Sequence, residues 1–203
     1  ASLLINDVAM LLAFVTGVFL ARHRARGTHG SNGVWPFWRL ADGAPRRSLW
    51  RDIGLGIVSY PLFLWAVNLA ALANQVLIEK LGMKPDTHVL MKELGRPQSA
   101  SVVTLFFVMA VVGAPFFEEL IFRGMLYNVM RRYLGATAGA CSAALLFAAV
   151  HAVWSQTMAL FVLALILTWL YDRTGRLVAG MTLHAVNNAV SLVLALYLQR
   201  QGG

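Results

Sequence analysis

Six apolar stretches constrain the fold of this 203-residue chain more than any other feature. They lie at about residues 3–21, 53–78, 101–117, 134–153, 158–171 and 177–198. A membrane-spanning helix takes roughly 20 apolar residues, so the first, second, fourth and sixth stretches are long enough to cross a bilayer. The fifth is short, which predicts a tilted helix, an extension into its flanks, or a position within the bundle. The pattern predicts an all-α, polytopic transmembrane helical bundle of about six spans.

Composition narrows the class of protein further. Hydrophobic residues make up 59% of the chain and charged residues 13%, whereas a soluble domain is usually about 45–50% apolar and about 25% charged. This excludes a disordered chain, a nucleic-acid-binding domain and an ordinary soluble enzyme. The net charge of +8 then indicates which loops face the cytoplasm rather than a nucleic-acid partner.

The basic residues are distributed unequally between alternate loops. Segments 22–52, 123–133 and 172–176 hold seven, three and two, or twelve in all, whereas the opposite side holds five. This bias predicts that the first, third and fifth loops are cytoplasmic and that both termini lie outside the cytoplasm. Arginines follow residues 3–21 and no basic region precedes them, so we expect a retained anchor rather than a cleaved signal peptide.

The chain is expected to form one membrane domain with two parts. Residues 1–100 would provide N-terminal spans and a basic, aromatic loop, and residues 101–203 would form the core. In the loop, Trp35, Trp38 and Trp50 lie near several arginines, a combination that suits the lipid headgroup layer. An interfacial anchor is the preferred interpretation, and a gate or lipid-binding element stays open.

The third stretch leads into a pair of glutamates. No Pro or Gly cluster stops this helix before residue 130, although Pro115 is expected to kink it. Glu119 and Arg123 are four residues apart, so they face each other on a helix and can form an ion pair. Glu118 is rotated about 100° from Glu119, and we expect it to serve as a general base. A purely structural role for the ion pair is equally compatible with the sequence.

Two histidines and an asparagine follow in later stretches. Ionisable groups inside a bilayer are costly, which makes them functional candidates. His151 ends the fourth stretch and could alternatively be an interfacial or hydrogen-bonded core residue. His184 and Asn188 are four residues apart and share one helix face. If they converge with Glu118, the set supplies a base, an imidazole that holds water, and donors for a developing oxyanion.

The same residues raise the question of zinc. Two histidines and a glutamate are a common catalytic zinc set, for which Glu118, His151 and His184 are the candidate ligands. The His-Glu-x-x-His pattern of zinc proteases is missing, because Ala-Val-Trp-Ser follows His151. Zinc is therefore compatible but not required, and glutamate-activated water is the preferred interpretation. No Gly-x-Ser-x-Gly elbow of a serine hydrolase occurs.

Depth in the membrane sets a condition on a shared site. Glu118 lies 13 residues before Arg131, near mid-membrane, whereas His151 lies 17 residues after Leu134. At about 1.5 Å per residue, the second interval is nearly a full crossing. A common site therefore requires a tilted, kinked or late-starting helix.

Three motifs in order carry a family resemblance. They are Glu-Glu-x-x-x-Arg at 118–123, Phe-x-x-x-His at 147–151 and His-x-x-x-Asn at 184–188. Together they resemble the CAAX protease and bacteriocin-processing (CPBP, ABI) family of intramembrane endopeptidases, which includes the type II CAAX prenyl endopeptidases. Tyr-Asp-Arg-Thr-Gly at 171–175 is similar to the Tyr-x-x-Thr-Gly turn of this family. The resemblance covers about residues 102–196.

The resemblance implies a membrane-embedded endopeptidase that hydrolyses peptide bonds of membrane-associated or lipidated peptides. It implies that Glu118 and His151 activate the water and that Glu119 and Arg123 support the site. His184 and Asn188 would stabilise the oxyanion. The family has been described both as metalloproteases and as glutamate-dependent proteases, so zinc stays an alternative. The resemblance to bacterial members also implies a multi-pass protein of the bacterial plasma membrane, with the bilayer and a peptide or protein substrate as partners.

A second class of function remains open. The chain could be a non-catalytic membrane subunit or scaffold that retains the family core and binds a membrane-protein partner. The aromatic, basic loop 22–52 is the feature that favours it. A separation of the four polar side chains beyond water-bridging distance would support this alternative. A transporter is disfavoured, because the sequence shows no inverted repeat with broken helices.

Overall fold

The computed structural model describes residues 48–86 and 99–201, and side chains as far as residue 198. In these ranges all regular secondary structure is helical, which confirms the predicted all-α membrane bundle. The predicted span at 3–21 and most of loop 22–52 lie outside the described residues. The division at residue 100 stays a prediction.

Four helical segments of the described chain are long and apolar enough to cross a membrane. They are α2 (Leu49–Lys80), the column Ala100–Leu134, the segment Trp154–Thr174, which combines η3 (Trp154–Gln156) with α8 (Thr157–Thr174), and Leu177–Leu198 of α9 (Leu177–Gln201). The fifth helix, α7 (Ala136–Val150), has only 15 residues. The expectation that the fourth stretch is long enough to span is therefore wrong, whereas the fifth extends into its flanks, which is one of the predicted alternatives. Turns at Gly135 and Ala152, both with positive φ, bound α7, whereas η3 lengthens the fifth segment.

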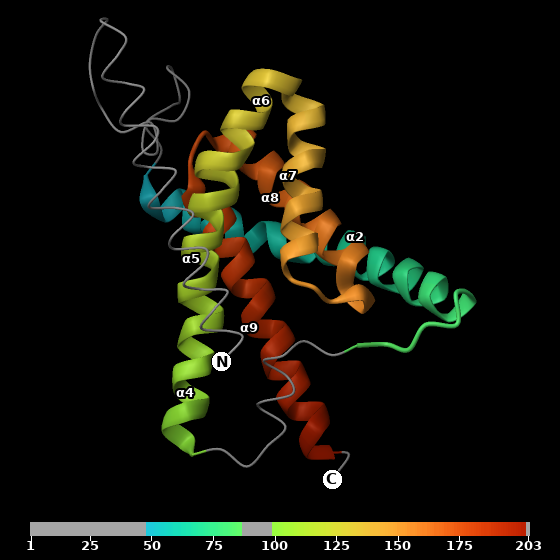
Figure 1. The fold of residues 1–203 in the computed structure, drawn as a ribbon. Helices are drawn as coiled ribbons and strands as arrows, with labels where there is room; N and C mark the ends of the chain where they lie inside the picture. Colours follow the sequence, from blue (N-terminus) through green and yellow to red (C-terminus); the bar gives the residue numbers. More distant parts are fainter. Residues whose placement is uncertain (1–47, 87–98, 202–203) are drawn as a thin grey trace, which may run out of the picture.

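The column Ala100–Leu134 is one helical rod with two wider, π-helical segments (Figure 1). In order it comprises α4 (Ala100–Val108), η1 (Met109–Gly113), α5 (Ala114–Glu119), η2 (Leu120–Tyr127) and α6 (Asn128–Leu134). The predicted continuation of this helix beyond residue 117 is confirmed. The short α5 carries both glutamates between the π segments, and π-helical segments are frequent at functional sites.

Pro115 leaves the Ala110 carbonyl of η1 without a backbone donor. The Ala114 N–H bonds to the Met109 carbonyl, five residues back. In that register the next donor, facing the Ala110 carbonyl, would be the nitrogen of Pro115, which carries no hydrogen. Asn188 of α9 replaces it, donating from Nδ2 to Ala110 O at 2.9 Å. The proline thus changes the helix register and joins the column to α9.

Helices α6 and α7 form an antiparallel hairpin that turns at Gly135, where φ is +82° (Figure 1). The helices approach so closely at Gly139 that an added Cβ would lie 2.7 Å from the Arg131 nitrogen. Ala143, one turn further along, is buried. Gly139 and Ala143, which are four residues apart on one face of α7, therefore let α7 pack closely against α6, while Gly135 makes the turn.

Helix α2 packs across α8 and α9. The crossing is close at Gly56, where an added Cβ would lie 2.6 Å from the Ala179 carbonyl oxygen. Near this point, the buried Asp52 forms an ion pair with Arg176 at 2.7 Å. The apolar contact continues with Phe63 and Val67 against a buried cluster of α8 and α9 leucines. The predicted span at 53–78 is thus a full member of the bundle.

Ion pairs place the predicted cytoplasmic loops at one end of the bundle. Arg131 bonds to Asp172 at 2.7 Å, and Asp52 bonds to Arg176. The alternation of loops in the sequence is consistent with these contacts, whereas the orientation of the bundle in the membrane stays a prediction. Arg123 does not belong in the count of basic loop residues that predicted the orientation, because it is buried within the bundle and is not a loop residue.

Candidate active site

The ion pair predicted between Glu119 and Arg123 is present and buried. Arg123 Nη1 lies 2.8 Å from Glu119 Oε1, and both residues are 1% exposed. Arg123 Nη2 donates to the Ala164 carbonyl at 2.9 Å, and its guanidinium lies 4.9 Å from the centre of the Phe147 ring. Carboxylate, carbonyl and aromatic face together fix the arginine, so the Glu119 carboxylate accepts from a guanidinium that is held in place.

Glu118 has different surroundings from its neighbour. It is buried, and its Oε2 atom has no hydrogen-bond partner among the residues that the structure describes. That oxygen faces two imidazole nitrogens, His184 Nε2 at 3.6 Å and His151 Nε2 at 3.8 Å. These separations are too long for direct hydrogen bonds, but a water could bridge them. The three side chains come from α5, the end of α7 and α9, as the sequence predicted.

His184 lies between the two glutamates. Its Nδ1 is 3.2 Å from Glu119 Oε1, and its Nε2 faces Glu118. An ionised carboxylate only accepts hydrogen bonds, so Nδ1 is the donor to Glu119. The neutral ring then presents a lone pair to Glu118, and the doubly protonated ring presents a second donor. His184 is therefore oriented by Glu119 and can exchange a proton with whatever lies beside Glu118.

His151 is held by the end of its own helix. It is the C-cap of α7, and its Nδ1 lies 2.6 Å from the Phe147 carbonyl oxygen. With Nδ1 as the donor, Nε2 is an acceptor that points toward Glu118. The His151 side chain is 17% exposed and that of Glu118 9%, so the site is more open on the His151 side.

The α6–α7 hairpin explains why these residues reach the same depth. Glu118 precedes the turn at Gly135 by 17 residues, and His151 follows it by 16. Equal distances along antiparallel helices bring two residues to one level. No full membrane crossing separates them, because the chain runs from Glu118 to the turn at Gly135 and returns along α7 to His151. From the sequence, a common site required a tilted, kinked or late-starting helix. The structure brings the residues together by the α6–α7 hairpin instead.

Asn188 lies on the same helix as His184, but its described contact is elsewhere. Its Nδ2 bonds to Ala110 O in the column, as noted above. The structure therefore places the imidazoles of His151 and His184 within 3.8 Å of Glu118. It bonds Asn188 to the helical column that carries Glu118.

A family model described as "Type II CAAX prenyl endopeptidase Rce1-like" matches residues 100–190. We refer to residues 100–190, the segment that is similar to this family, as the Rce1-like domain. This match confirms the predicted resemblance at the level of the family and supports a membrane CAAX endopeptidase. No curated protein and no solved structure matches the chain. The Rce1-like domain spans the column, α7, α8 and the first half of α9, including all the predicted site residues.

Gly180 is a member of the site that the sequence motifs missed. It precedes His184 by one helical turn, and an added Cβ would lie 3.1 Å from Glu119 Oε2. The carboxylate therefore packs directly on the backbone of α9. The available signal was the spacing of four that Gly180 shares with His184 and Asn188, which places all three on one face.

The fit of the Rce1-like domain to a metal is a separate question. The sequence offered Glu118, His151 and His184 as zinc ligands. Among the described residues, no group of three or more His, Cys, Asp or Glu side chains is arranged to hold a metal ion. The described arrangement thus does not fit zinc, and the steps below use the side chains of the chain alone.

Proposed function

We propose that the Rce1-like domain is a membrane-embedded endopeptidase that hydrolyses peptide bonds of membrane-associated or lipidated peptides. The observation that carries the proposal is the oxygen of Glu118: it is buried, has no hydrogen-bond partner within residues 48–86 and 99–201, and faces two imidazole nitrogens. A carboxylate that supported the fold alone would be paired, as Glu119 is. Water-bridging separations between Glu118 and both histidines also favour an enzyme over a non-catalytic scaffold.

In the first step a water binds between Glu118 Oε2 and His151 Nε2. Glu118 accepts one proton of this water while the oxygen bonds to the scissile carbonyl carbon. The carbonyl oxygen becomes an oxyanion. His151 is oriented through Nδ1 by the Phe147 carbonyl, and its Nε2 accepts a hydrogen bond from the water. This bond directs a lone pair of the water oxygen toward the substrate carbonyl carbon. This is general base catalysis by a positioned carboxylate.

The oxyanion then requires hydrogen-bond donors. His184 can donate from Nε2 when its ring carries both protons, because Nδ1 is already bonded to Glu119. Asn188 carries two hydrogens on Nδ2, one of which bonds to Ala110 O, and the second is assigned to the oxyanion. Two oriented donors of this kind stabilise a tetrahedral intermediate without reorganisation.

The second step breaks the peptide bond. The tetrahedral intermediate collapses, the carbon–nitrogen bond breaks, and the proton held by Glu118 passes to the leaving amine. The products are a carboxylic acid and an amine, and Glu118 is again ionised. The remaining water proton then passes from the acid to the amine, which gives a carboxylate and an ammonium group. Glu119 and Arg123 take no part in these transfers; they hold the ring of His184 in place.

The direct test is the cleavage rate of Glu118→Gln with a membrane-associated peptide substrate. Glutamine keeps the shape but cannot accept a proton, so the rate should fall by about 10²–10⁴-fold, the usual contribution of a positioned base. Glu79→Gln is a matched control, because Glu79 lies exposed on α2 and its side chain bonds only to Gln75 in the described contacts. A wild-type rate in Glu118→Gln would end the proposal.

A further inference from the structure

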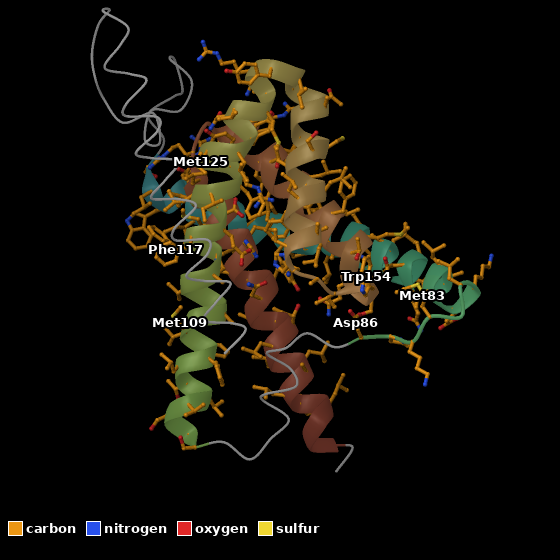
Figure 2. All side chains as sticks on the ribbon, in the orientation of Figure 1. Met83, Asp86, Met109, Phe117, Met125 and Trp154 are labelled. Carbon is orange, nitrogen blue, oxygen red and sulfur yellow. The ribbon has the colours of Figure 1, made fainter. Side chains whose placement is uncertain are left out.

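Two polar residues outside the Rce1-like domain bond to the turn that follows His151. Asp86, just beyond α2, accepts the Trp154 N–H on Oδ2 at 2.9 Å and the Ser155 N–H on Oδ1 at 2.8 Å. The Ser155 hydroxyl donates back to Asp86, with Oδ1 at 2.7 Å and the carbonyl oxygen at 2.8 Å. Figure 2 shows Asp86 beside Trp154. Asp86 therefore caps the helical segment that begins at Trp154.

Asn74 bonds to the same turn from within α2. Its Nδ2 donates to the Trp154 carbonyl at 2.8 Å, and its Oδ1 accepts the Met158 N–H at 3.2 Å. Asn74 is 3% exposed in a long apolar helix. Both its side-chain nitrogen and its side-chain oxygen thus bond to a segment about 80 residues further along the chain. We call Asn74 and Asp86 the turn clamp.

The turn itself has a backbone conformation that requires support. Ala152 has φ +50°, and among the described residues it is the one non-glycine with positive φ. Residues held in this region persist only where their surroundings fix them. Ala152 directly follows His151, and Val153 is buried. The clamp therefore fixes the chain at Trp154, Ser155 and Met158, three to seven residues beyond the histidine whose imidazole faces Glu118.

We propose that Asn74 and Asp86 are positioning residues that hold His151 against Glu118, so that the α2 segment completes a site otherwise built by the Rce1-like domain. The inference rests on the proposed function for its kinetic consequence but not for its geometry. Without the clamp, α7 still ends at His151, but the turn relaxes from its Ala152 conformation and the imidazole loses its fixed approach to Glu118. Misplacement by about 1 Å can cost as much as 10²-fold in rate.

The first experiment measures geometry and needs no substrate. Side-chain nitrogen NMR of ¹⁵N-histidine-labelled protein in micelles is recorded for the wild type, Asn74→Leu and Asp86→Ala, with His151→Ala and His184→Ala to assign the signals. The His151 signals should shift or broaden in both clamp variants while those of His184 stay unchanged. Unchanged His151 signals, or equal changes at both histidines, would overturn the proposal.

The controls separate the clamp from general loosening of the fold. Asn68→Leu removes a similar amide from α2, but Asn68 bonds only within its own helix, to Leu64 O, in the described contacts. It should leave His151 unchanged. If a full truncation does not fold, Asp86→Asn and Asn74→Asp each keep one acceptor oxygen and should give smaller changes in the same direction. Identical spectra in these milder, folded variants would also overturn the proposal.

The second experiment measures kinetics and separates the two proposals. Asp86→Ala should lower kcat by up to about 10²-fold with little change in KM. It should lower the rate no further in a His151→Ala background, because both changes act on the same group. Additive losses would overturn the positioning role. A wild-type protein without peptidase activity would overturn the proposed function alone, and the NMR result would still decide the position of His151.

Discussion

Two adjacent glutamates of one helix lie in opposite surroundings. Glu119 is bonded to Arg123 and His184, and it packs on the backbone of Gly180. In the described part of the chain, one oxygen of Glu118 has no hydrogen-bond partner, and it faces two imidazoles at 3.6 and 3.8 Å. Both residues are buried, so exposure does not explain the difference.

The comparison indicates that Glu119 stabilises the fold and that Glu118 serves the reaction. A buried charge is tolerated when it is paired and hydrogen-bonded, as Glu119 is. A buried oxygen without a partner is costly, and it persists where it has another use. On this account, changes around Glu119 should affect stability first, and changes at Glu118 should affect activity alone.

The largest effect on stability is expected from Glu119→Gln. The substitution removes the charge that compensates Arg123, whose guanidinium is almost fully buried. Breaking a buried pair in this way typically costs about 3–5 kcal/mol. The free energy of unfolding, measured by titration with sodium dodecyl sulfate in micelles, should fall by this amount. Glu118→Gln is the matched comparison and should leave that free energy nearly unchanged. Equal losses in the two variants would contradict the division of roles.

A smaller loss is expected from Asn188→Leu. The half-buried Ala110 carbonyl would lose its donor. An unsatisfied, fully buried polar group costs about 1–3 kcal/mol, so the loss here should lie at the low end of that range. The second change Pro115→Ala restores a backbone N–H that faces Ala110 O in the register of η1. The double variant should therefore be more stable than Asn188→Leu alone. If Pro115→Ala destabilises the two backgrounds equally, the link between Pro115, Ala110 and Asn188 is wrong.

Gly180→Ala tests how tightly Glu119 is held. The added methyl would lie 3.1 Å from Glu119 Oε2, and overpacking of this kind typically costs about 1–3 kcal/mol. Replacing glycine within a helix regains about 0.5–1 kcal/mol, so the net loss should be small. Gly54→Ala is the control, because nothing lies within 4 Å of its added Cβ, and it should be stabilising. Thermal unfolding of both variants measures the difference; a stabilising Gly180→Ala would show that Glu119 has room to move.

Much of this comparison could be predicted from spacing, because spacing determines which residues share a helix face. The pairing of Glu119 with Arg123 followed from a separation of four, as did the shared face of His184 and Asn188. The depth of His151 did not follow, since it depends on the turn at Gly135 and on where α7 ends. Asn74 and Asp86 were missed because their partners are distant in sequence, and no local pattern indicates such contacts. Gly180 was missed although it shares the spacing of four with His184 and Asn188, because a glycine carries no polar group that marks a site.

The smallest effect concerns pH and the clamp residue Asp86. Partial burial raises the pKa of this carboxyl, but hydrogen bonds from Ser155 and Trp154 outweigh it, and the net pKa is lowered below the ordinary value. A carboxyl with a lowered folded pKa contributes full stability above its unfolded pKa of 3.8 and loses it as pH falls through the folded value.

The stability difference between wild type and Asp86→Asn should therefore stay constant between about pH 8 and pH 5, well above this transition. Unfolding midpoints recorded across that range check the expectation. A difference that shrinks between pH 8 and pH 5 would mean that Asp86 does not carry the bonds assigned to it.

The most direct test of the central claim is the density between Glu118, His151 and His184, in a crystallographic or cryo-EM map that shows ordered water. The account predicts one water within about 2.6–3.2 Å of Glu118 Oε2 and of His151 Nε2, the reach of a general base. A tetrahedral ion at about 2.0–2.2 Å from Glu118 and both histidines would contradict it and indicate zinc. So would a direct hydrogen bond from another side chain to Glu118 Oε2, because that oxygen would then be paired as Glu119 is.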